Sequence, residues 1–432
     1  MLQAVINAFK LRDLRNRILF TLGVLVIFRL AAHIPLPGVD PEGLKRVFEA
    51  NQLLGLLNMF SGGAMMTFSI VAMGVYPYIT AQIIVQLLTP IIPQLEELAQ
   101  EGEAGRQKMA LYTRLVTVPL AALQGYAQAS LLARPAAGGV PVIANWGFSS
   151  GTWLSTLSVI LTLTAGTLFA VWLGELIDEQ GIGNGLSILI FGGIVAQMPQ
   201  NIASLWVSNP WSLLLFGAIT IVTVVGIVFV QEGQRRIPVQ YAKRVRGTKM
   251  YGGQRVEIPL PVNSAGMIPL IFAVSILLFP GMVASYFVYA ETQWIANIAN
   301  IIVRVFDSNG IFYWVMYFLM VVGFTYFYTD VIFAQQDLAG NLRKQGGAIV
   351  GYRPGKPTSD YLNGVLRRIT LVGALFLGIV AILPFLMRLV SETGTMLINS
   401  TGLLIVVGVV LDTMKQLEAQ LRMRHYEGFL KK

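Results

Sequence analysis

The sequence predicts an all-α polytopic membrane protein with ten transmembrane helices in two inverted sets of five. Three observations carry this prediction: an apolar composition, ten apolar segments, and one motif repeated at equivalent places in both sets. Of the 432 residues, 55% are hydrophobic and only 12% are charged, and the mean hydropathy is +0.66. A soluble domain cannot bury that much apolar surface, whereas a bilayer accepts it. The composition therefore places the chain in a membrane.

Ten apolar segments are candidates for the spans. A helix needs roughly 20 apolar residues to cross a bilayer, so the fifth and tenth segments, which are shorter, depend on their flanks. The segments centre on Ile18–Ala32, Val71–Leu88, Leu111–Leu132, Leu154–Leu176, Leu186–Met198, Trp211–Val230, Met267–Met282, Phe312–Phe333, Ile369–Met387 and Gly402–Met414.

Basic residues orient the spans. Most of the 31 Lys and Arg residues precede the first span, follow the second, sixth and eighth spans, or lie in the tail. Cytoplasmic loops carry an excess of Lys and Arg, so both termini are expected in the cytosol. The distribution of tryptophan supports the same orientation, because tryptophan is enriched where spans meet the membrane surface. The tryptophans near the predicted outer ends are Trp146, Trp153, Trp206, Trp211, Trp294 and Trp314.

The spans divide into two halves, residues 1–210 with spans one to five and residues 211–432 with spans six to ten. An odd number of spans in each half makes equivalent helices run in opposite directions, the inverted-repeat plan of many transport proteins. The motif Gly-x-x-Pro-x-Ile occurs at 74–79 in span two and at 266–271 in span seven. Such interruptions are tolerated where the freed backbone groups face protein or a wet cavity, so the pair points to a central path. Chance or ordinary helix packing is the alternative interpretation.

The chemistry of the chain argues against an enzyme, a metal site and a cofactor. There is no Cys, and His33 and His425 lie near opposite ends of the chain. No nucleophile, base and orienting group come together in the sequence. Ionisable residues within the spans are scarce and lie towards span ends, whereas an ion-coupled carrier usually keeps a carboxylate near the midplane. The central positions of the repeated motif are isoleucines, which suit a pore sealed by a hydrophobic constriction.

Two long basic loops, at about 233–262 and 335–366, are expected on the cytosolic side. One interpretation is that they only set the topology and touch anionic lipid. Both loops are longer than topology requires. The other interpretation is therefore that they dock a soluble partner, such as ribosomal RNA or an acidic protein face. In the first loop, apolar residues from Val239 to Val245 alternate with basic ones, as in a solvated hairpin. The glycines of 181–185 are expected to form a tight turn and no nucleotide site, because no strand precedes them.

Several stretches, taken in order, resemble one family of membrane proteins. They are LLGLLNMFSGGAMMTFSIVAMGVYPYITAQIIVQLLTP (53–90), EGEAGRQ (101–107), GIGNGLSILIF (181–191), QRRIPVQYAKR (234–244), VNSAGMIPLIFA (262–273) and GYRPGKPTSDYL (351–362). Together they are similar to the SecY/Sec61-alpha family, whose bacterial members are the large subunit of the protein-conducting channel. The resemblance runs from the first span to the tail.

The resemblance implies a clamshell of two five-helix halves around an hourglass pore, with a plug helix at about 53–66. A ring of aliphatic side chains would seal the pore midway, and each copy of the repeated motif would supply one of them. The implied pore ring is Ile79, Ile83, Leu186, Ile190, Ile271 and Ile405. The implied plug residues are Leu53, Leu56, Leu57, Met59, Phe60, Ser61, Gly62 and Gly63.

The resemblance also implies a lateral gate, between spans two and three on one side and spans seven and eight on the other. Thr80, Gln124 and Asn263 match a polar cluster at that gate. Ordinary hydrogen bonding between helices would account for the same three residues. The residues implied to contact the SecA motor or the ribosome are Arg353, Lys249, Arg244 and Arg246.

By this resemblance, the chain would be the central pore-forming subunit of the Sec translocase in the bacterial plasma (inner) membrane. It would be a passive gated channel for secretory proteins and for lateral insertion of membrane proteins, driven by the SecA ATPase or the translating ribosome. Its implied partners are SecE and SecG, SecA, the ribosome, signal sequences and translocating polypeptides, anionic lipids, and the accessory proteins SecD/SecF and YidC. The competing hypotheses are an ion-coupled small-solute secondary transporter and a purely structural membrane scaffold.

Overall fold

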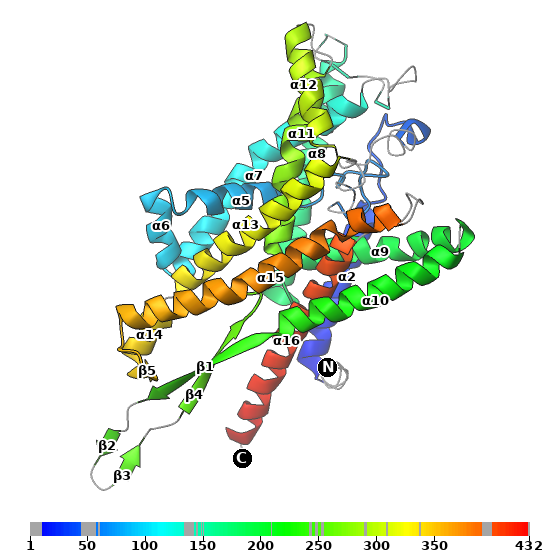
Figure 1. Ribbon diagram of the computed structural model, residues 1–432. Coiled ribbons are helices and arrows are strands. Elements are labelled where there is room, and N and C mark those ends of the chain that lie inside the picture. The colour runs from blue at the N-terminus through cyan, green and yellow to red at the C-terminus, as the bar shows by residue number, and fades with distance from the viewer. Residues whose placement is uncertain are drawn as a thin grey trace. The chain divides into compact units, whose positions relative to one another are not determined.

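The computed structural model of the chain is mostly helical (Figure 1). It describes residues 11–44, 58, 61–133, 142–143, 146–147, 149, 151–208, 210–241, 244–246, 249–251, 255–288, 292–307, 310–336, 338–390 and 400–430. The helices are α2 (Arg12–Ala31), α5 (Tyr76–Leu88), α6 (Pro93–Gln100), α7 (Glu103–Leu132), α8 (Trp153–Gln180), α9 (Gly185–Ser208), α10 (Pro210–Glu232), α11 (Ile268–Phe287), α12 (Gln293–Val305), α13 (Ile311–Gln336), α14 (Leu338–Lys344), α15 (Lys356–Val390) and α16 (Ser400–Leu430). The strands are β1 (Gln234–Tyr241), β2 (Arg244–Arg246), β3 (Lys249–Tyr251), β4 (Arg255–Pro261) and β5 (Gly347–Ile349).

These strands correct the predicted all-α class. All five lie within the two basic loops, and the rest of the described chain contains helices, turns and two isolated bridges. The first loop does form the expected hairpin, because β1 pairs with β4 and β2 pairs with β3, all antiparallel. Hydropathy marks only the membrane segments, so it could not reveal a sheet between them.

Each of the ten predicted spans overlaps a helix. Among the described residues, four helices are long and apolar enough to cross a membrane, or five if α5 and α6, which meet at a bend of 104°, form one span. Shorter apolar helices cover Gly185–Pro199, Gly217–Glu232 and Ile268–Gly281. The chain is thus a multi-helix membrane protein by length and composition, and the count of ten stays a prediction.

The repeated Gly-x-x-Pro-x-Ile motif starts helices and does not break them. Gly74 and Gly266 have φ of 53° and 63°, a left-handed backbone that favours glycine. The proline that follows is the second residue of α5 or of α11. Proline is tolerated in a first turn because the N–H it lacks would have no helical partner there. The motif therefore sets its isoleucine one turn into each helix.

The chain forms two compact units. The first comprises residues 1–217, 274–314 and 405–432, and the second comprises residues 218–273 and 315–404. These units differ from the predicted halves, 1–210 and 211–432, and the inverted repeat of those halves stays a prediction.

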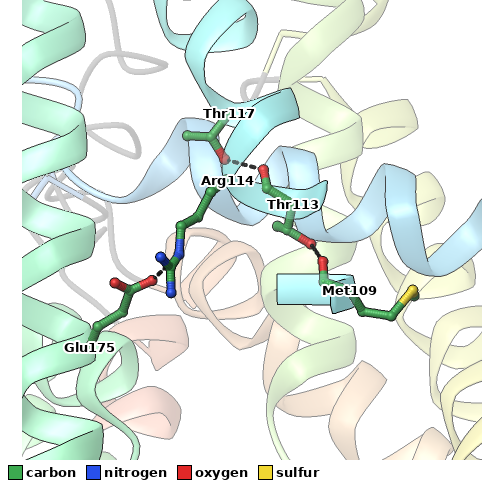
Figure 2. A network of polar contacts seen from close by, with 5 residues as sticks. All are labelled: Met109, Thr113, Arg114, Thr117 and Glu175. Atoms are coloured by element: carbon green, nitrogen blue, oxygen red, sulfur yellow. Dashed lines mark hydrogen bonds and ion pairs between the residues drawn. The ribbon is translucent and has the colours of Figure 1, made fainter. Parts of the chain in front are cut away.

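In the first unit, α8 is the central helix. It lies against α2, α5, α7 and α9, and α5 also packs on α7. At the tight turn into α9, Gly185 approaches Gly174 so closely that a Cβ on Gly185 would overlap the Gly174 carbonyl. An ion pair between Arg114 Nε and Glu175 Oε1, 2.6 Å apart, joins α7 to α8 (Figure 2).

In the second unit, a small sheet packs against the helices α14 and α15. Its strand order is β4-β1-β5, with both pairs antiparallel, so the two basic loops are joined through β1. Figure 1 shows β2 and β3 at the tip of the long β1–β4 hairpin. Alternate residues of β1, Ile237 and Val239, are buried. They belong to a hydrophobic core that is completed by Leu260, Leu342, Ile349, Leu362 and Leu366.

We expect Gly185→Ala to destabilise the first unit. The new Cβ would overlap main-chain atoms of α8 that cannot rotate away, at a cost of about 1–3 kcal/mol. Thermal unfolding of the purified protein, followed by size-exclusion chromatography, would show a lower midpoint. Gly23→Ala on α2 is the matched control, because nothing lies within 4 Å of its Cβ position. Equal midpoints for the two variants would contradict the close contact.

Candidate pore, plug and gate

The predicted pore-ring residues lie on four helices and are largely buried. Ile79 and Ile83 are one turn apart on α5, and Leu186 and Ile190 are one turn apart on α9. Residues four apart share a helix face, so each helix presents a pair. Ile405, on α16, is 1% exposed.

The first compact unit contains five of the six ring residues. Ile271, on α11, is buried but belongs to the second unit. The ring as a closed constriction therefore stays a prediction.

The predicted plug is described only at its C-terminal end. Leu53, Leu56, Leu57, Met59 and Phe60 lie outside the described residues. Asn58 is helical, and Ser61 to Met66 form turns. The extent of the plug, about 53–66, stays a prediction. Gly62 and Gly63 have φ of 66° and 90°. Two successive left-handed residues cannot continue a right-handed helix, so the chain turns at these glycines.

Two of the predicted gate residues meet in the structure. Gln124 Nε2 on α7 donates to Thr80 Oγ1 on α5 across 3.5 Å, and Thr80 Oγ1 donates to the Tyr76 carbonyl. The Gln124 side chain is buried, yet its Oε1 has no hydrogen-bond partner within the described part of the chain. The α5–α7 contact, which joins the two helices of one side of the predicted gate, is thus polar and only partly satisfied.

The third gate residue, Asn263, lies in the second unit. Its Nδ2 donates to the Gly266 carbonyl across 2.9 Å and so holds the turn that starts α11. Its Oδ1 is buried and has no partner in the ranges that the structure covers. The structure thus gives Asn263 a local role, and its part in a gate with Thr80 and Gln124 stays a prediction.

The predicted partner-contact residues lie on the loops of the sheet. Arg246 pairs with Lys249, and Arg244 with Tyr251, in the register of β2 and β3. Arg353 is exposed in the turn that follows β5, and its carbonyl accepts a hydrogen bond from Thr358 Oγ1 at the start of α15. Because β5 pairs with β1, one sheet carries both loops.

One contact was not predicted from the sequence. Arg29, the single charged residue inside the first predicted span, donates from Nη1 to the carbonyl oxygen of Gly62. The only signal in the sequence is the charge itself, because an ionisable residue in a span needs a partner. Nothing in the pattern of residues says where that partner lies.

Comparison with solved structures gives the class of fold. A structure described as a protein-conducting channel matches with a TM-score of 0.61 at 17% identity, over 94% of this chain and 92% of that one. The Sec61 chain of a canine ribosome–channel complex matches with a TM-score of 0.60, again at 17% identity and over 94% and 92% of the two chains. The chain thus has the fold found in protein-conducting channels.

Comparison of sequences then gives the family. The family model of SecY matches residues 69–414. The protein translocase subunit SecY of Mycobacterium bovis is 43% identical over 449 residues, with 100% of both chains covered. The SecY subunit of Streptomyces galbus is 44% identical, also over 100% of both chains, and that of Thermotoga maritima is 42% identical over 100% of this chain and 98% of its own. The chain belongs to the SecY family.

We expect Ile349→Ala to loosen the sheet that carries the basic loops. Ile349 is 4% exposed in the core of the sheet, and truncation of such a residue costs about 2–5 kcal/mol. Trypsin should then cut faster after Arg343 and Lys344, which precede β5, by at least about tenfold. Val350→Ala is the control, since Val350 is 56% exposed. Equal cleavage rates in the two variants would contradict the role of β5.

Proposed function

We propose that the chain is the central pore-forming subunit of the Sec translocase in the bacterial plasma membrane, with both termini in the cytosol. It acts as a passive gated channel, across the membrane for secretory proteins and laterally into it for membrane proteins. The observation that carries the proposal is full-length identity of 43% with proteins named protein translocase subunit SecY. The chain supplies a conduit and no catalysis.

The aliphatic ring supports a sealed pore. Ile79 and Ile83 are buried on one face of α5. Ile190 is buried on α9, and Ile405 is buried on α16. A constriction lined by such side chains excludes water and ions, because nothing in it replaces their hydration. Such a constriction also offers no specific binding site for a polypeptide. A polypeptide of any sequence can therefore pass.

The polar contact between Gln124 and Thr80 supports the lateral gate. At 3.5 Å it is at the long limit of a hydrogen bond, and Gln124 keeps a further acceptor without a partner in the described ranges. The contact joins α5 and α7, the two helices of one side of the proposed gate, and so holds that side together. In the proposed gate, a polar contact from this side to the other would favour closure, and a signal helix that replaces it would shift the two-state equilibrium towards the open gate.

The sheet supports docking of cytosolic partners. It presents Arg353, and β2 and β3 carry further Lys and Arg residues at the tip of the hairpin. Basic loops attract acidic protein faces and nucleic acid phosphates. The SecA motor and the ribosome are the partners proposed here. Solved relatives include Sec61 in a ribosome–channel complex and a yeast Ssh1 complex bound to the 80S ribosome.

The remaining proposed partners follow from membership of the family. SecE and SecG complete the channel, anionic lipids contact the basic loops, and SecD/SecF and YidC are accessory proteins. The translocating polypeptide and its signal sequence are the substrate.

The rival function, an ion-coupled small-solute carrier, is not favoured. Glu175 lies near a helix end and is held by Arg114 at 2.6 Å. Asp178, one turn further on, accepts a hydrogen bond from the Gly185 N–H at 2.8 Å, which caps the start of α9. Both carboxylates thus have structural partners near a helix end, whereas a coupling carboxylate would lie near the midplane.

The first experiment tests the path. Single cysteines replace Ile79 or Ile271 in this cysteine-free chain, which is reconstituted with a SecE-type subunit in proteoliposomes. A stalled secretory precursor carrying a thiol-reactive probe should crosslink at both positions, because both line the proposed pore. Ile84→Cys is the control: it lies on the other side of α5 and is 36% exposed, so no crosslink is expected. A productively stalled precursor that reached neither ring position would refute the pore assignment.

We expect Arg353→Glu to abolish SecA-driven translocation while the protein stays folded. The residue is exposed in a loop, so reversal of its charge should repel an acidic partner without disturbing the core. Translocation of a precursor with SecA and ATP is the measurement. Arg343→Glu, which reverses an exposed charge on α14, is the control and should retain activity. Normal translocation by Arg353→Glu would remove this residue from the docking surface.

A further inference from the structure

Arg29 raises a question that the proposed pore, gate and docking loops leave open. It lies inside the first predicted span, where an unpaired charge is costly. Its guanidinium reaches away from α2 and donates from Nη1 to the main-chain oxygen of Gly62. The partner is therefore a backbone carbonyl in the turn Ser61–Gly63 at the C-terminal end of the predicted plug, and no carboxylate pairs with Arg29 among the described residues.

That turn is a built structure. The Gly63 N–H donates to the Asn58 carbonyl at 2.8 Å, and Ser61 Oγ donates to the same carbonyl at 3.1 Å. The Met66 N–H donates to Asn58 Oδ1 at 3.1 Å. Asn58 and Ser61 are 5% and 1% exposed. The turn Ser61–Gly63 is thus closed by its own polar groups and buried.

Helix α9 holds the other side of the turn. A Cβ on Gly193 would overlap the Gly62 backbone, and a Cβ on Gly62 would lie only 3.0 Å from the Gly193 Cα. One turn further along α9, the Gln197 Nε2 lies 2.6 Å from the place of a Cβ on Gly63. This Nε2 is buried and has no hydrogen-bond partner among the described residues. Gly193 and the buried Gln197 amide thus meet the turn at places where no side chain would fit.

The chain after the turn is fixed independently. The Leu36 N–H donates to the Phe68 carbonyl at 3.0 Å, and the Ile70 N–H donates to the Ile34 carbonyl at 3.1 Å. These bonds tie residues 68–70 to the segment that follows α2. The turn Ser61–Gly63 therefore lies a few residues before a tied segment.

We propose that Arg29, Gly193 and Gln197 form a dock for the turn Ser61–Gly63, and that this dock sets the resting position of the plug segment. The positional role rests on the proposed function, because only a channel has a plug to hold. In this role Arg29 is a positioning residue. Its charge suits the task, since a charge-assisted hydrogen bond to a carbonyl is stronger than a neutral one, and loss of the bond leaves the charge without that partner.

The test measures exposure of the turn by cysteine labelling. Ser61→Cys places a thiol in the turn, and Ser69→Cys places one in the tied segment, where Ser69 is 0% exposed. With native Arg29, a membrane-impermeant maleimide should label both slowly in the reconstituted complex. With Arg29→Met, labelling at 61 should accelerate at least about tenfold, because a charge-assisted bond is lost, while labelling at 69 stays slow. Arg29→Lys should restore most of the protection.

A second variant makes the test independent of charge. Gly193→Ala should also expose position 61, since its methyl group would displace the turn. Gly192→Ala is the matched control on the neighbouring residue, where a Cβ would meet only the flexible end of the Leu25 side chain. Its labelling should equal that of the native chain.

Two outcomes would overturn the dock. Protection of position 61 in both Arg29→Met and Gly193→Ala would show that the turn does not depend on these residues. Equal acceleration of labelling at positions 61 and 69 in Arg29→Met would show that Arg29 supports the whole region and does not position the turn. Labelling needs no precursor, so a native chain that fails to translocate would refute the proposed function alone, while the labelling result would still decide the dock.

Discussion

Close contact between backbones at glycine is the constraint on which the rest of this structure depends. In lipid, helices gain little from burying apolar surface against each other, so their packing relies on small residues that let main chains approach. Gly185 lies against the Gly174 carbonyl, Gly166 lies against the Ile70 carbonyl, and Gly193 lies against the turn at the C-terminal end of the predicted plug. In each case a methyl group would occupy the place of a main-chain atom. The positions of α8 and α9, and of the segment that leads into α5, follow from these contacts.

The second constraint is that polar groups must find partners inside the protein. Most do so locally: Thr113 and Thr117 donate to the carbonyls four residues earlier, as Figure 2 shows. The exceptions are therefore informative. Several buried side-chain atoms lack a partner in the described ranges, and among them are Gln124 Oε1 and Gln197 Nε2. Gln124 belongs to the predicted gate and Gln197 to the proposed dock.

The sequence predicts the positions of the helices well because hydropathy responds to length and composition. It does not predict that α5 begins at Tyr76, since the preceding segment Val71–Val75 is equally apolar and only the left-handed Gly74 stops the preceding turn. Helix α12, with 13 residues, is too short to register as a span. The pairing of β1 with β5 joins residues about a hundred positions apart, and no local pattern encodes it. The contact between Arg29 and Gly62 likewise depends on tertiary structure. Sequence motifs alone therefore could not predict the proposed dock.

A channel needs one part that stays rigid and another that yields, and the two kinds of contact differ in strength. The sheet of the basic loops has its own hydrophobic core, in which Val239 and Ile349 are almost fully buried, so it can present Arg353 in one geometry. By contrast, the α5–α7 polar contact is 3.5 Å long. Burial of several aliphatic side chains contributes many times the free energy of one long hydrogen bond. The proposed docking loops would therefore keep their shape while the α5–α7 contact rearranges within its side of the proposed gate. In the proposed function, this difference in free energy would let the same chain hold a partner and open a path.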